Sequence, residues 1–300
     1  MKQLCLLLLA AGLSQAQQND NVQVHILPVQ GSVYMLIGGG ANTTLQVGKD
    51  GVAVVDTQVA DMASKVVTAI RTLSPMPIRY IVNTDASADH AGGNAALVKL
   101  AGAMPRIIAN DHVLNRMSLR PPGGQPAFAE ADWPNDEYFA PTKDFFFNNE
   151  AVVVYHMPAA HTDGDSIVFF RRSDVLSVGN IFTPDTYPVI DVAKGGTVQG
   201  EIDALNRILE LTVPAKYQEG GTYVIPGRGR LCEEADVVEY RDMVTIIRDR
   251  IQDLMRKGKT LAQVKAARPT LDYDTQYGAT SGSWNTDMFI EAIYKSLGGK

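Results

Sequence analysis

The chain is organised around residues 81–94, which read Ile81-Val82-Asn83-Thr84-Asp85-Ala86-Ser87-Ala88-Asp89-His90-Ala91-Gly92-Gly93-Asn94. The apolar start of this stretch predicts a buried strand, and the Gly-Gly pair at its end predicts a turn into a helix. The loop between them carries four potential ligands within six residues, namely Asp85, Ser87, Asp89 and His90. Such a density of polar side chains at a strand end is typical of a metal site or a catalytic site.

The first sixteen residues have the pattern of a secretory signal peptide. Lys2 precedes an apolar run over 4–13, and Ser14-Gln15-Ala16 places small residues at the two positions that a signal peptidase reads. The run is too short to span a bilayer permanently. Because no Pro/Ser-rich linker, charge block or repeat divides the rest, we expect residues 17–300 to form one domain that is exported to the periplasm or secreted.

Composition restricts the partners that this chain can have. It carries 33 acidic and 27 basic residues, a net charge of −6, with no Lys/Arg cluster, which argues against nucleic acid and anionic membranes as partners. No later window is apolar enough for a membrane span. Once Cys5 leaves with the signal peptide, Cys232 is the remaining cysteine, so a hydrophobic core must supply the stability. We therefore expect a small-molecule substrate or ligand, and the sequence leaves the oligomeric state open.

The periodicity of apolar residues predicts an α/β protein. A two-residue period predicts an antiparallel meander over 22–56, and a helical period follows over 59–73. The segment 119–142 is rich in Pro, Gly and aromatic residues and predicts a long loop, either a lid over the site or a plain surface excursion. The other expected strands lie at 78–83, 106–109, 145–147, 151–156, 166–171, 175–178 and 222–225, and the other helices at 94–101, 111–117, 199–211, 235–255, 261–267 and 287–296.

Five motifs in a fixed order resemble those of the metallo-β-lactamase-fold superfamily, whose members are metal-dependent hydrolases and related enzymes. The resemblance covers nearly the whole mature chain and implies a four-layer αββα sandwich. The stretch from Asn83 to Asn94 is similar to the family's Thr-His-x-His-x-Asp-His-x-Gly-Gly-Asn. The other motifs are Gly51-Val52-Ala53-Val54-Val55-Asp56-Thr57, His161-Thr162-Asp163-Gly164-Asp165, Gly179-Asn180, where Gly-Asp is usual, and Pro226-Gly227-Arg228-Gly229, where Pro-Gly-His-Gly is usual.

The resemblance also implies seven metal-ligand positions, of which three keep the expected residue, namely Asp89, His90 and His161. The first-metal positions are Asp85, Ser87 and His161, the second-metal positions are Asp89, His90 and Arg228, and the bridging position is Asn180. Zinc prefers imidazole and thiolate ligands, whereas Arg228 cannot lose its proton to become a ligand. These substitutions argue against a dinuclear zinc site.

Two interpretations of this altered site remain open, beside a third in which the protein has a purely structural or interaction role. In the first, one divalent ion is held by Asp85, Asp89, His90, His161 and the Asn180 carbonyl, with Arg228 paired to Asp89. The carboxylates then favour Mn²⁺, Fe²⁺ or Mg²⁺ over Zn²⁺, and Asp89 takes part in hydrolysis of a small ester, amide or lactam. In the second, a non-catalytic protein keeps the fold and binds a small molecule or anion against Arg228.

Several further residues are expected to support or surround this site. The resemblance implies that Asp56, Thr162 and Asp165 position the ligands, and that Ser87 lines the site. Cys232 is expected to be a buried, inert thiol, because Arg230 is its one basic neighbour in the sequence. The other histidines, His25, His112 and His156, are expected to be packed or exposed side chains with no ligand role.

Overall fold

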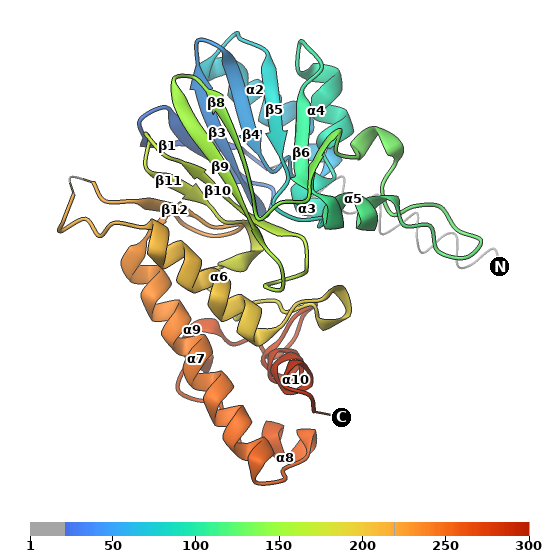
Figure 1. Ribbon diagram of the computed structural model, residues 1–300, viewed down its shortest axis with the longest axis vertical. Coiled ribbons are helices and arrows are strands. Elements are labelled where there is room, and N and C mark those ends of the chain that lie inside the picture. Colours follow the sequence, from blue (N-terminus) through green and yellow to red (C-terminus); the bar gives the residue numbers. More distant parts are fainter. Residues whose placement is uncertain (1–21, 219, 300) are drawn as a thin grey trace.

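Two β-sheets stack face to face at the centre of this computed structural model, which describes residues 22–218 and 220–299 (Figure 1). The predicted signal peptide lies outside the described residues. The seven-stranded sheet A follows chain order: β1 His25–Gln30, β2 Val33–Gly38, β3 Ala41–Gly48, β4 Gly51–Val55, β5 Ile78–Val82, β6 Arg106–Asn110 and β7 Asp136–Tyr138. The six-stranded sheet B has the order β13-β12-β11-β10-β9-β8, formed by β8 Thr142–Phe147, β9 Glu150–Met157, β10 Asp165–Phe170, β11 Val175–Ser177, β12 Tyr223–Ile225 and β13 Cys232–Glu233.

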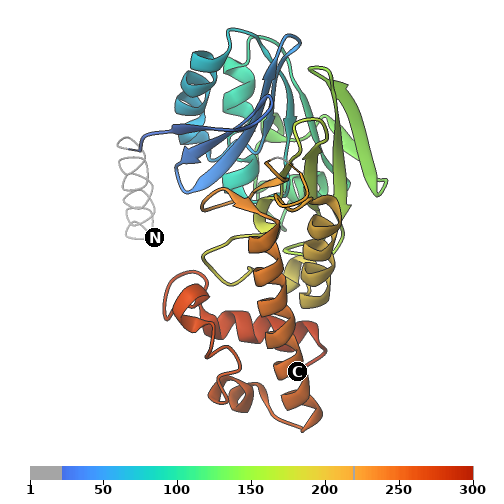
Figure 2. The same ribbon diagram turned by 90° about the vertical axis from the view of Figure 1, so that its left-hand side faces the viewer.

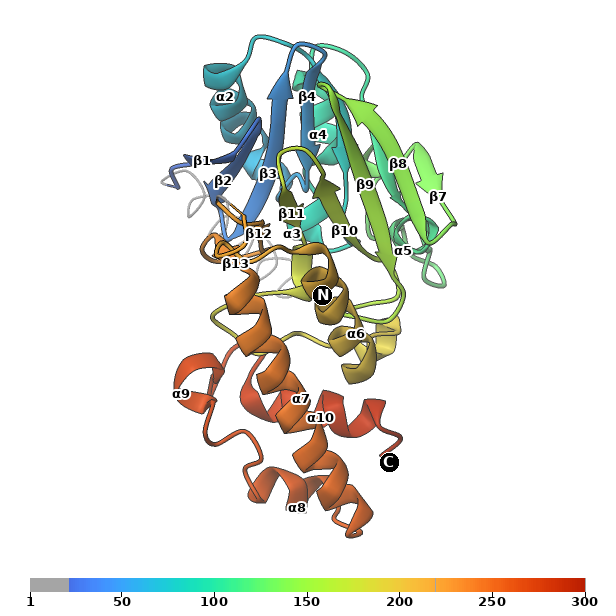
Figure 3. The same cartoon turned by 60° about the vertical axis from the view of Figure 1, so that its left-hand side comes forward.

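Helices cover the outer face of each sheet, so the four-layer αββα sandwich predicted from the sequence is confirmed (Figure 3). On sheet A lie α2 (Ala63–Leu73) and α4 (Asn94–Leu100). On sheet B lie α6 (Val198–Leu211) and the start of α7 (Glu234–Arg256), and α10 (Thr286–Ser296) packs against these two helices. The shorter helices are α3 Ala88–Ala91, α5 Asp111–Ser118, α8 Leu261–Ala266, α9 Asp274–Tyr277 and the 3₁₀ turns η1 Ala60–Met62, η2 Glu130–Asp132, η3 Gly179–Ile181 and η4 Val192–Lys194.

The side chains of each strand point alternately to the two faces of its sheet, and this divides the core into layers. In β2, Met35 points between the sheets while its neighbour Leu36 packs beneath α2, because successive side chains of a strand leave on opposite faces. Val82 from sheet A and Phe170 from sheet B meet in the layer between the sheets, where both are buried. Each fully buried aliphatic or aromatic side chain contributes roughly 1.5–3 kcal/mol, so these layers hold the strand ends in place.

The C-terminal helices extend beyond the sheets (Figure 2). Their core is continuous with that of sheet B, and the Tyr187 and Phe289 rings stack there with centroids 4.5 Å apart. Within residues 22–218 and 220–299, no helix is long and apolar enough to cross a membrane. Cys232 is buried, and burial raises the pKa of its thiol to about 12, which agrees with the expectation of an inert thiol.

The loop predicted over 119–142 is wrong at one point, because residues 136–138 form β7. This strand pairs in parallel with β6, from Ile108 opposite Asp136 to Asn110 opposite Tyr138. The Tyr138 hydroxyl then shares a 2.8 Å hydrogen bond with the Ser166 hydroxyl of sheet B. The pairing of β7 with β6 and the burial of Tyr138 therefore hold this strand in place, although two of its three residues are acidic.

Candidate functional site

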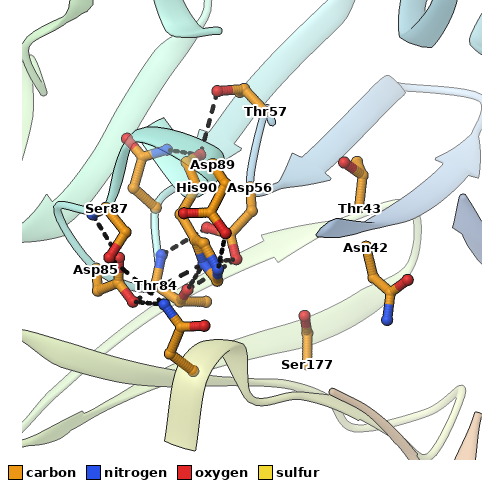
Figure 4. Close-up of polar contacts among 12 residues, drawn as sticks. Asn42, Thr43, Asp56, Thr57, Thr84, Asp85, Ser87, Asp89, His90 and Ser177 are labelled. Atoms are coloured by element: carbon orange, nitrogen blue, oxygen red, sulfur yellow. Dashed lines mark hydrogen bonds and ion pairs between the residues drawn. The ribbon is translucent and has the colours of Figure 1, made fainter. Parts of the chain in front are cut away.

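The predicted residues come from segments at the ends of strands. Asp56 follows β4 and the loop 83–90 follows β5, and these two strands are parallel, so their carboxyl ends meet at one edge of sheet A. Asn180 follows β11 and Arg228 follows β12, a second parallel pair, in sheet B. His161 lies in the loop between β9 and β10. Figure 4 shows the polar groups gathered around His90, namely Asp56, Thr84, Asp85 and Asp89.

Asp56 holds the loop that carries the predicted ligands. Its backbone lies in the left-handed region with φ 61°, a conformation that non-glycine residues rarely adopt. Its carboxylate accepts hydrogen bonds from the Thr84 backbone N–H at 2.8 Å and from the Thr84 hydroxyl at 2.7 Å. The His90 Nδ1 atom lies 2.8 Å from both the Asp56 carboxylate and the Thr84 hydroxyl. These contacts fix the imidazole ring through Nδ1 and leave its Nε2 atom for other contacts.

The charges around His90 favour its protonated form. Burial opposes protonation, but the carboxylates of Asp85 and Asp56 outweigh it and raise the pKa of His90 well above its usual range. Burial raises the pKa of Asp56. Burial also acts to raise the pKa of Asp85, yet His90 and His161 outweigh this effect and lower it. The carboxyl groups of Asp85 and Asp56, both buried, therefore favour the protonated form of His90.

Asp85 is held by donors of the protein. Its Oδ1 accepts a 2.6 Å hydrogen bond from the Ser87 backbone N–H, and its Oδ2 accepts one of 2.8 Å from the Asn180 amide. The same amide lies 3.4 Å from the Ser87 hydroxyl. We expected the Asn180 carbonyl to face a metal, but its nitrogen faces Asp85 instead, because a fully buried carboxylate needs donors.

Arg228 forms the ion pair with Asp89 that the sequence predicted. The guanidinium Nη2 lies 2.5 Å from Asp89 Oδ2, and the two side chains are 52% and 21% exposed. Within the described part of the chain, Nε and Nη1 of Arg228 donate no hydrogen bond, and Gly40 lies next to Nη1. Arg228 therefore presents free donors at the rim of the site.

His161 stands on a separate loop and is anchored through one nitrogen. Its Nδ1 donates a 2.6 Å hydrogen bond to the Val189 carbonyl, which leaves Nε2 unused by the residues that the structure describes. The loop is closed by the Asp165 carboxylate, which accepts from the Thr162 backbone N–H at 2.5 Å. Burial and the nearby charge of Asp85 raise the pKa of Asp165 well above its usual range. Thr162 and Asp165 thus shape the loop that carries His161.

Two residues contribute to the site that the sequence did not single out. Thr84 connects Asp56 to His90, and its place inside the central motif was the available signal. Asn42 of β3 donates hydrogen bonds to the Pro226 and Gly229 carbonyls on either side of Arg228, at 2.9 and 3.1 Å. No local pattern marks Asn42, because its partners are about 185 positions away along the chain.

Comparison with known proteins agrees with this geometry. The sequence model of the metallo-β-lactamase superfamily matches residues 36–218, which is more than half of the chain. The chain belongs to the metallo-β-lactamase superfamily. No match was found among curated proteins.

Several solved structures share the fold at low sequence identity. The stereoselective inverting sec-alkylsulfatase Pisa1 from Pseudomonas sp. is 18% identical, with a TM-score of 0.69, over 95% of this chain and 52% of that one. This chain thus spans about half the length of the alkylsulfatase. A metallo-β-lactamase from Pontibacter korlensis is 15% identical, with a TM-score of 0.59, over 74% of this chain and 99% of that one. VMB-1 is also 15% identical, with a TM-score of 0.58, over 74% of this chain and 97% of that one.

Members of this superfamily generally bind metals, but the residues of this chain do not fit a metal as they are arranged. Across 22–218 and 220–299, no group of three or more His, Cys, Asp or Glu side chains could hold a metal ion. Both oxygens of Asp85 already accept hydrogen bonds, and Asp89 is paired with Arg228. A metal would have to displace a fixed positive charge, which costs coulombic energy. The single divalent ion predicted from the sequence stays a prediction that this arrangement does not support.

Proposed function

We propose that this protein binds a small anionic molecule at Arg228 without a metal ion. One observation carries the proposal: protein donors already hold the carboxylates that would serve as metal ligands. Arg228 pairs with Asp89, and the Asn180 amide donates to Asp85. An arginine at the second-metal position keeps a positive charge there but changes its chemistry from a Lewis acid to a hydrogen-bond donor.

The free side of Arg228 sets the class of ligand. Asp89 uses one terminal nitrogen, so the remaining N–H groups of the half-exposed guanidinium point to no described acceptor. A planar guanidinium pairs well with carboxylate, sulfate or phosphate oxygens through two parallel hydrogen bonds. The structurally similar alkylsulfatase is, by its name, an enzyme for a sulfated compound, and sulfate belongs to this class of anions.

A second candidate is metal-dependent hydrolysis of a small ester, amide or lactam, with Asp85, Asp89, His90, His161 and Asn180 as ligands and Asp89 in the chemistry. A specific observation favours it. His90 Nε2 is buried with no hydrogen-bond partner among the described residues, and it lies 3.7 Å from Asp89 Oδ2. A buried nitrogen without a partner is unusual in a structural residue. In both candidates the protein is exported, as its N-terminal segment indicates.

Titration of chelator-treated protein with sodium sulfate, phosphate and acetate, followed by NMR or calorimetry, tests the proposal. We expect binding of at least one anion, weakened about tenfold or more by Arg228→Ala, because the paired donors are lost. Arg230→Ala is the matched control, since Arg230 lies two residues later, is 58% exposed and is fully paired with Asp236.

Two outcomes would overturn the proposal. Anion affinity that is unchanged in Arg228→Ala would remove Arg228 from the ligand site. Retention of about two zinc ions per chain after dialysis would show that Arg228 does not exclude the second metal. One bound ion with hydrolysis of a test ester would favour the second candidate.

A further inference from the structure

We propose that Asn42 is a positioning residue that fixes the Arg228 guanidinium at the site, so that loss of the Asn42 amide weakens anion binding although Asn42 touches no ligand. The inference rests on the function proposed above, because Asn42 acts through Arg228. Asn42 belongs to β3 of sheet A, whereas Arg228 follows β12 of sheet B. Figure 4 shows Asn42 on its strand, apart from the group around His90.

The contacts of Asn42 bracket Arg228 on both sides. Its side-chain Nδ2 donates to the Pro226 carbonyl at 2.9 Å and to the Gly229 carbonyl at 3.1 Å. Its backbone N–H donates to the Gly227 carbonyl at 2.9 Å. One residue with 5% exposure thus satisfies three carbonyl groups within four consecutive residues of the arginine loop.

Gly227 leaves the space that this clamp needs. The Gly227 N–H donates to the Gly179 carbonyl at 2.8 Å, and a Cβ on Gly227 would stand 2.6 Å from that oxygen. Gly40 lies beside Arg228 Nη1, where a Cβ would make an ordinary contact of 3.5 Å. The backbone on either side of Arg228 is therefore held by sheet A through Asn42 and by η3 through Gly179.

The ion pair with Asp89 does not fix this loop on its own. Arg228 is 52% exposed, and ion pairs at such exposure contribute little because water and salt screen them. The Asn42 amide, in contrast, is buried, and its removal leaves two carbonyls of the loop without that donor. Since a long side chain presents its charge accurately only when its backbone and neighbours are held, the amide of Asn42 decides where the guanidinium lies.

The experiment compares Asn42→Ala with Thr44→Val, using sulfate as the probe and chelator-treated full-length protein. Thr44 lies on the same strand and makes an equally buried 2.8 Å hydrogen bond to Ser177 of sheet B, but it does not contact the arginine loop. We expect Asn42→Ala to weaken sulfate binding about tenfold, because a small displacement of a binding group has large effects. Thr44→Val should leave the dissociation constant within about twofold of the wild type.

A double-mutant cycle separates positioning from general destabilisation. In an Arg228→Ala background, adding Asn42→Ala should change sulfate affinity no further, since its effect passes through Arg228. If Asn42→Ala weakened sulfate binding as strongly in the Arg228→Ala background as in the wild type, the inference would be overturned. The inference would also be overturned if Asn42→Ala and Thr44→Val, at equal stability, lost the same amount of sulfate affinity.

A second readout keeps the test independent of ligand binding. The ¹H–¹⁵N signal of Arg228 Nε, assigned by its absence in Arg228→Lys, should shift or broaden in Asn42→Ala and stay in place in Thr44→Val. If wild-type protein binds no anion while this signal behaves as expected, the proposed function fails and the positioning role holds. A signal that is unchanged in Asn42→Ala overturns the positioning role.

Discussion

The loop 83–90 has contacts with two carboxylates, one at Asp56, which follows the neighbouring strand β4, and one at its own Asp89 end, and these carboxylates are held differently. At the Asp56 end, a buried carboxylate contacts Thr84 and His90 through three hydrogen bonds or close ion contacts of 2.7–2.8 Å. At the Asp89 end, a carboxylate at the rim has one arginine partner that is half exposed. Buried contacts of the first kind hold the fold, whereas exposed contacts of the second kind can be exchanged for a ligand. The difference shows an intact superfamily scaffold, and it supports our proposal that the chemistry at the rim has changed.

The largest effect is expected from restoring the family residues at the altered positions. We predict that the variant Asp85→His, Ser87→His, Asn180→Asp and Arg228→His binds zinc, because imidazole and carboxylate ligands replace the donors that now occupy the site. Metal content after dialysis, measured by mass spectrometry, checks this expectation. A folded variant that binds no zinc would count against the assigned correspondence of these positions.

A smaller effect, on the stability of the fold, is expected from removing the buried carboxylate of Asp56 alone. Asp56→Asn should lower the free energy of unfolding by about 3–5 kcal/mol, because it breaks a buried pair and leaves the His90 imidazolium less compensated. Asp89→Asn is the matched control at the rim and should cost about 0–1 kcal/mol. Urea denaturation of both variants gives the comparison directly. Equal losses would show that burial does not distinguish the two ends.

The smallest effect concerns the buried carboxyl group of Glu201. Glu201 of α6 is fully buried, and both of its oxygens lack a hydrogen-bond partner within the described chain. Glu201→Leu should raise the free energy of unfolding at pH 7 by about 1–3 kcal/mol, because it removes an unsatisfied buried group.

The same variant has a pH dependence of known sign. Burial and the charge of Asp165 raise the pKa of Glu201 well above its usual range, so the folded state holds this proton more tightly than the unfolded state. Wild-type stability therefore falls as the pH rises from the unfolded pKa through the folded pKa. The increase in the free energy of unfolding that Glu201→Leu gives should become smaller toward pH 4, as measured by urea titrations. Glu201→Gln serves as the control that removes the charge and keeps the shape, and a gain independent of pH would contradict the assignment.

Most of the fold could be predicted from the sequence because its apolar periods are strong. The helix over 59–73 and the strands around the central motif were placed to within a few residues. The strand β7 was missed because Asp136 and Glu137 carry no apolar alternation, and pairing with β6 makes the strand. The two-residue strand β13 was missed for the same reason, since pairing with β12 defines it.

The site was predictable in its residue types and not in its orientations. The pairing of Arg228 with Asp89 was predicted, because both residues follow strand ends that the fold brings together. The contact of His90 with Asp56 was not predicted. The orientation of Asn180 depends on the donors that Asp85 needs once it is buried, which is a property of the folded protein. Asn42 acts across the two sheets, and no local signal in the sequence reports such a contact.

The pairing of Arg228 with Asp89 has a consequence for selectivity. Asp89 is an internal competitor, present in every molecule at a fixed distance from the guanidinium. An external anion gains only the difference between its own pairing and the one that Asp89 already makes. A ligand with a single oxygen repeats what Asp89 offers, whereas a carboxylate or sulfate that spans two donors gains more. In the proposed anion site, this competition would therefore select ligands by geometry rather than by charge alone.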